Sequence, residues 1–67
     1  MLSLIFGNLD EDLEVVKVKD SRLEELGIHQ GAVIRIIAKL NSGFIVKVGD
    51  ARISLDINTV KKVYVKC

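Results

Sequence analysis

The 67-residue sequence lacks the features that mark several classes of protein. It has one cysteine, Cys67, so no disulfide can form within the chain, and nothing indicates an oxidising compartment. Charged side chains interrupt every apolar stretch well before the ~18 residues that a transmembrane helix needs. The opening residues 1–8 have neither the basic start nor the small-residue cleavage site of a secretory signal. We therefore expect a cytoplasmic protein with no direct membrane insertion.

Neither sign of charge dominates, because the net charge is +1. The two parts of the chain differ, however: residues 1–25 carry a net charge of −4 and residues 26–67 a net charge of +5. The aromatic side chains are few, namely Phe6, Phe44 and Tyr64. Nucleic-acid-binding proteins usually combine clustered cations with aromatic side chains for stacking. The composition therefore argues against a nucleic-acid partner, which stays open only because of the basic second part.

Alternation of apolar and polar side chains is the strongest pattern in the sequence. Residues 13–19, 32–40, 44–48, 51–55 and 63–66 each read as a strand. Within residues 32–40, the period of two predicts that one side of the strand carries Ile34, Ile36, Ala38 and Leu40, and that the other carries Val33, Arg35, Ile37 and Lys39. Residues 41–43 and 49–50 are typical of tight hairpin turns. The sequence predicts a mainly β fold: one domain over residues 1–67, a small barrel of about five antiparallel strands.

Residues 21–31 predict a short helix followed by a stop. Ser21 and Glu24 have the spacing of a capping box, in which each side chain accepts from a backbone N–H of the first turn. Leu23 and Leu26 then share one face of the helix. Gly27 follows at the position where a left-handed residue ends a helix at little cost.

Two further turns are expected. Gly31 permits a sharp bend before the strand that begins near Val33. Residues 56–62 predict one helical turn, capped by Asp56, before the last strand. Both features are structural.

No group of residues has the pattern of a catalytic or metal site. His29 is the only histidine, and a zinc site needs three or four ligands, while a nucleophile needs a positioned partner. The acidic run lacks the spacing of a calcium loop; its members are Asp10, Glu11, Asp12 and Glu14. We expect no enzyme activity, no catalytic residue, no metal and no cofactor. One alternative is a metal-sensing module that uses His29, Cys67 and acidic side chains.

The pattern of residues 22–31, followed by the strands and turns above, resembles the FeoA family of ferrous iron transport accessory proteins. The most specific part is "RLEELGIHQG", with Arg22, Leu23, Leu26, Gly27 and Gly31, and the resemblance extends from Leu2 to Val65. Two positions depart from the family, which commonly has proline where Gln30 stands and another in the hairpin where residues 40–43 stand.

The resemblance implies an SH3-like barrel in the bacterial cytoplasm, without catalytic residues. Its partner would be the membrane permease for ferrous iron, whose cytosolic part includes a nucleotide-binding domain. A similar barrel forms the C-terminal domain of some metalloregulators, which is why metal sensing stays an alternative. We expect a monomer or a weak homo-oligomer.

Two surfaces are candidates for partner binding. The outward side of the central strands carries Val33, Ile37 and Ile45, and a contiguous apolar patch often marks a contact site. The alternative is that the N-terminal arm folds over this side as a second small core; its apolar residues are Leu2, Leu4, Ile5 and Phe6. The second candidate is the hairpin loop with Leu40, Asn41 and Phe44.

Overall fold

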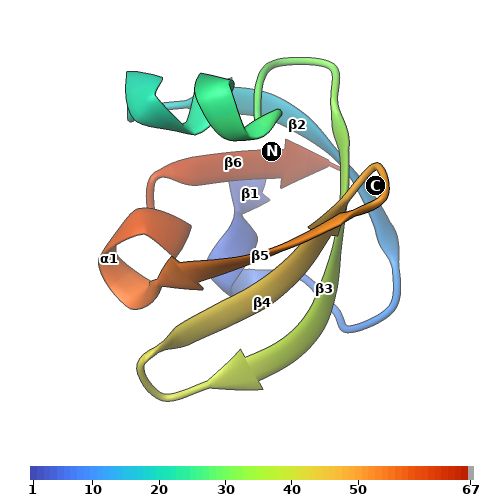
Figure 1. Cartoon of the computed structure of the whole chain (residues 1–67), viewed down its shortest axis with the longest axis vertical. Coiled ribbons are helices and arrows are strands. Elements are labelled where there is room, and N and C mark those ends of the chain that lie inside the picture. Colours follow the sequence, from blue (N-terminus) through green and yellow to red (C-terminus); the bar gives the residue numbers. More distant parts are fainter. Residues whose placement is uncertain (67) are drawn as a thin grey trace.

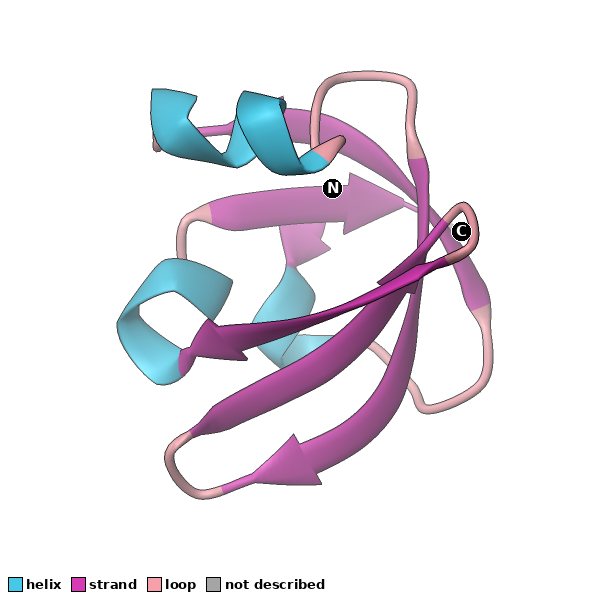
Figure 2. Cartoon of the chain, viewed as in Figure 1, coloured by secondary structure: helices cyan, strands magenta, loops and turns pink. Residues whose placement is uncertain are grey.

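Six strands form one antiparallel sheet in the order β1-β6-β2-β3-β4-β5. A computed structural model of the chain describes residues 1–66. Figure 1 shows the strands curving around the core, and Figure 2 shows how little of the chain is helical. The strands are β1 (Leu2–Ser3), β2 (Asp12–Val18), β3 (Val33–Leu40), β4 (Gly43–Val48), β5 (Ala51–Asp56) and β6 (Val63–Lys66). The five predicted strands are confirmed, and β1 is an addition.

The core lies on the concave side of this sheet, where the apolar side chains of alternate residues meet. Its buried members come from every strand except the two-residue β1, and from the segments between strands. No polar or charged residue is buried among those that the structure describes. The core residues are Leu4, Leu13, Val15, Leu23, Ile28, Ile34, Ile36, Phe44, Val46, Leu55, Val60, Val63 and Val65.

A β-bulge in β3 overturns part of the predicted alternation. Ile36 pairs with Val46, whereas Ala38 pairs with Ile45, so Ile37 is an extra residue without a counterpart in β4. Beyond Ile37 the side chains change sides, and Leu40 is 55% exposed. The prediction that Ala38 and Leu40 share a side with Ile36 is therefore wrong, because a period of two holds only while the pairing is uninterrupted.

The N-terminal arm packs into the main core. β1 pairs with β6, and the short 3-10 helix η1 (Leu4–Phe6) follows it. Leu4 is fully buried in the core cluster and Ile5 packs against that cluster, while Phe6 is 75% exposed. The arm thus completes the main core and does not build a second core over the outer side of β3 and β4.

The predicted helix of residues 21–26 is present as the 3-10 helix η2 (Ser21–Leu26), with a different cap. Asp20, not Ser21, is the N-cap, and its carboxylate accepts a hydrogen bond from the backbone N–H of Arg22 at 3.1 Å. The expected stop is confirmed: Gly27 has φ of 86°, in the left-handed region, and its N–H donates to the Glu24 carbonyl. The capping-box prediction failed because two neighbouring residues, Asp20 and Ser21, can both cap a helix.

The second predicted turn is confirmed. It forms the single helical turn α1 (Ile57–Val60) between β5 and β6. The Asp56 carboxylate accepts from the Thr59 N–H at 2.7 Å, and Val60 is buried in the core. In Figure 1, α1 lies at the ends of β5 and β6.

The hairpin between β3 and β4 turns at residues 41–42 and so ends one residue earlier than the predicted turn of residues 41–43. Gly43 is the first residue of β4 and is buried there, paired with Leu40 on one side and Asp56 on the other. A Cβ at Gly43 would collide with the carbonyl oxygen of Leu55. Glycine is needed here because two backbones approach closely, and not because a turn requires a positive φ.

We expect Gly43→Ala to destabilise the fold by about 3 kcal/mol, since β4 or β5 must shift to admit the methyl group. Gly31→Ala is the matched control, because Gly31 has φ of 91° but open space around it, and should cost only about 1 kcal/mol. Urea denaturation of both variants measures the difference. Equal losses would show that the close approach to Leu55 does not constrain the sheet.

Candidate docking face

The outer side of β3, β4 and β5 carries most of the residues that the sequence suggests for partner binding. Val33 is 53% exposed in β3, Leu40 is exposed at the end of the same strand, and Asn41 is exposed in the turn that follows. Ile45 also faces outward, because its neighbours Phe44 and Val46 are buried and successive side chains of a strand point to opposite sides. Its side chain is half-buried. We call the outer side of β3, β4 and β5, with Val33, Leu40, Asn41 and Ile45, the docking face.

Two other predicted contact residues differ from expectation. Phe44 is buried in the core, and the Nζ of Lys39 lies 5.4 Å from the centre of its ring, so it is not available to a partner. Ile37 is the bulge residue and is half-buried. Alternation within residues 44–48 puts Phe44 on the same side as Val46, and that side is buried. Alternation could not place Ile37, because the bulge in β3 interrupts the period of two.

A row of charged side chains crosses the same face. Asp12 of β2 pairs with Arg35 of β3, Arg35 with Lys47 of β4, and Lys47 with Arg52 of β5. All four residues are exposed. Residues directly opposite each other on neighbouring strands have side chains on the same side of the sheet, so these four lie side by side. The sequence alone does not reveal this row, because the residues come together only once the register of three strand pairs is known.

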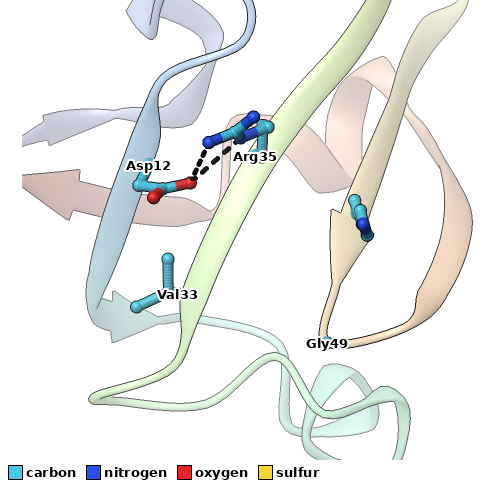
Figure 3. Close-up of a pocket in the computed structure, with 5 residues that line it drawn as sticks. Asp12, Val33, Arg35 and Gly49 are labelled. Carbon is cyan, nitrogen blue, oxygen red and sulfur yellow. Dashed lines mark hydrogen bonds and ion pairs between the residues drawn. The ribbon is translucent and has the colours of Figure 1, made fainter.

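The Asp12 end of the row borders an open hollow of about 380 Å³, lined by Asp12, Val33, Arg35, Lys47 and Gly49. Figure 3 shows the Arg35 guanidinium directed across to Asp12. Nε and Nη2 of Arg35 both approach Oδ1 of Asp12, at 3.0 and 2.8 Å. The Asp12 side chain is 65% exposed, so water screens this ion pair and its contribution to stability is small.

The described residues do not bring together a metal site. Residues 1–66 contain no group of three or more side chains that could hold a metal ion. His29 is exposed, with Nδ1 3.0 Å from the Gln30 carbonyl oxygen, and Cys67 lies outside the described residues. Two of the acidic side chains considered above form ion pairs instead, Asp12 with Arg35 and Glu14 with Lys66. Within residues 1–66, no helix is long and apolar enough to cross a membrane.

The motif of residues 22–31 folds as the 3-10 helix η2 followed by a turn that leads to β3. Leu23 and Ile28 are buried, and the Ile28 N–H donates to the Leu23 carbonyl at 3.0 Å, which holds the residue after Gly27 against η2. Leu26 is 47% exposed at the end of η2, so of the two leucines only Leu23 belongs to the core. Gly31 has the positive φ expected for its bend.

Comparison with known proteins identifies the family. The model of the FeoA domain matches residues 4–67. The chain belongs to the FeoA family. Members of this family are non-enzymatic accessory proteins of ferrous iron transport. The match includes the whole 22–31 motif and the docking face, so the resemblance noted in the sequence is confirmed.

One solved structure shows the same fold. It is the crystal structure of an iron uptake regulatory protein (FeoA), which superposes with a TM-score of 0.86 at 24% sequence identity. The match covers 97% of this chain and 93% of the other. No curated protein matches the sequence significantly.

The cap of η2 has a predictable pH dependence. Asp20 accepts two hydrogen bonds from the Arg22 side chain, at 2.7 and 3.0 Å, and these lower its pKa from 3.8 to about 2. Because the folded-state pKa is depressed, the stabilisation is fully present above pH 3.8 and is lost as the pH falls through about 2.

We therefore expect Asp20→Asn, which keeps a cap acceptor but loses the charge, to lower the melting temperature at pH 7 and to have a much smaller effect near pH 2. Asp50→Asn, in the exposed turn between β4 and β5, is the control and should leave the melting temperature unchanged at both pH values. If the melting temperature of Asp20→Asn is lowered as much near pH 2 as at pH 7, the charge of Asp20 does not stabilise the helix.

Proposed function

We propose that this chain is a cytoplasmic accessory protein of ferrous iron uptake, which binds the cytosolic part of the ferrous iron permease through the outer surface of a single SH3-like barrel domain. The observation that carries the proposal is the match of the FeoA domain to residues 4–67. The family is non-enzymatic, so the activity of this chain lies in what its surface binds.

The docking face has the composition that a protein contact needs. Interfaces between proteins have an apolar centre and a polar rim. Here Val33, Leu40 and Ile45 supply apolar area on neighbouring strands, and the charged row lies beside them. Ile37 at the bulge and Asn41 in the turn border the same face, whereas the buried Phe44 acts only by supporting the hairpin from beneath.

The nucleic-acid alternative has less support. A surface that binds single strands needs exposed aromatic side chains on which bases stack. Phe44 is in the core, and the half-buried ring of Tyr64 lies 5.1 Å from the Nζ of Lys19. The most exposed aromatic side chain, Phe6, belongs to η1 and not to the docking face.

A double substitution tests the proposal. Val33→Lys combined with Leu40→Lys places two charges in the apolar part of the face, and we expect it to abolish binding to the purified cytosolic part of the permease, measured by titration calorimetry. The melting temperature should change little, since both side chains are more than half exposed.

Phe6→Lys is the control, because it also replaces an exposed apolar side chain with lysine but lies outside the docking face. It should bind as the parent chain does. Loss of binding by Phe6→Lys together with normal binding by the double variant would place the contact at the N-terminal arm. Failure of the parent chain itself to bind the cytosolic part would overturn the proposed function.

A further inference from the structure

Three cations lie directly opposite one another on the docking face. Arg35, Lys47 and Arg52 are register partners across β3, β4 and β5, and like charges in such positions destabilise a sheet. A small domain has little stability to spare. Because the repulsion among these three cations lowers the stability of the fold, we looked for a function that would explain why they lie together.

The chain supplies little compensation of its own. In the part of the chain that the structure describes, the ion pairs join Asp20 to Arg22, Asp12 to Arg35 and Glu14 to Lys66. Neither Lys47 nor Arg52 forms an ion pair within residues 1–66. With Asp12 at one end, the row keeps a net charge of +2.

Arg35 also retains the capacity to bind a further carboxylate. A guanidinium has five N–H donors, and Asp12 accepts from Nε and Nη2 through one oxygen only. The Arg35 side chain is 44% exposed beside the open hollow, so its remaining donors can be reached from solvent. A second anion could therefore sit against Arg35 and Lys47 without displacing Asp12.

Apolar side chains alternate with the cations along the same side of the sheet. Val33 is two residues from Arg35 on β3, and Ile45 is two residues from Lys47 on β4, so each pair shares the outer side. The surface complementary to this pattern is a protein segment that combines carboxylates with apolar side chains. A nucleic acid fits less well, because Phe44, the aromatic residue of these strands, is buried and leaves the face without a ring on which bases could stack.

We propose that the row Arg35–Lys47–Arg52 is a docking site for an acidic segment of a partner protein, with Val33 and Ile45 contacting apolar side chains of that segment. The partner segment would thus present carboxylates and apolar side chains to this row. The identity of the partner rests on the proposed function. Charge pairing across an interface mainly sets the association rate and the choice of partner.

The central test is Lys47→Glu, with Lys17→Glu as the matched control. Both lysines are exposed residues of strands, and both substitutions change the charge by the same amount, but Lys17 pairs with Tyr64 and lies outside the row. Lys47→Glu places a carboxylate between Arg35 and Arg52, so the melting temperature should stay at or above that of the parent chain. Any loss of binding is then not a loss of folding.

Affinity is measured for the purified cytosolic part of the permease, and separately for a synthetic peptide that alternates glutamate and leucine. Lys47→Glu should weaken both complexes by about tenfold or more, and Lys17→Glu should leave them unchanged. Asp12→Asn should strengthen both by about two- to threefold, because it removes the carboxylate that competes for Arg35. Raising the salt concentration from about 0.05 M to about 0.5 M should weaken binding of the parent chain.

The outcomes separate this inference from the proposed function. Normal binding of Lys47→Glu to the cytosolic part would overturn the docking row while leaving the proposed function intact. If the parent chain binds the acidic peptide but not the cytosolic part, the row stands and the proposed function fails. Equal binding of the glutamate peptide and of its lysine counterpart, or tighter binding of a single-stranded oligonucleotide of equal charge, would overturn the inference.

Discussion

The pairing of β4 with β3 and β5 determines which side chains lie on the inner side of the sheet and which on its outer side. The register that buries Phe44 and Val46 also turns Ile45 and Lys47 outward, because successive side chains of a strand point to opposite sides. A slip of one residue would exchange the two sets. Gly43 protects this register, since only glycine can lie so close to the Leu55 carbonyl. The core and the docking face are therefore two results of one constraint.

Most of the fold follows from local patterns in the sequence. Alternation locates five strands, and Gly27, Gly31 and Asp56 locate the turns between them, because each of these depends on neighbouring residues. The features that were missed depend on distant residues. β1 has two residues and exists only through its pairing with β6, and the bulge at Ile37 is defined by what β4 places opposite it. No period within one strand reveals either feature.

The same distinction applies to the docking face. Val33 and Ile45 were expected on the outer side from alternation within a single strand, and the structure places them there. The charged row was not predicted, because Arg35, Lys47 and Arg52 become neighbours only through two hairpin registers. Phe44 was expected both in the strand of residues 44–48 and at the neighbouring loop contact, and its burial beside Val46 agrees with the alternation of that strand.

The uneven distribution of charge along the sequence places acidic and basic side chains on different strands of the sheet. The acidic first part of the chain supplies Asp12 and Glu14 on β2, and the basic second part supplies Lys47 and Arg52 on β4 and β5. Along the row, the outer surface therefore changes from negative at Asp12 to positive at Lys47 and Arg52, with the Asp12–Arg35 ion pair at the boundary. An acidic segment is repelled from one side of this boundary and attracted to the other, so the gradient determines where on the sheet such a segment lies. In a family without catalytic residues, a surface that selects and orients its partner is sufficient for an accessory role.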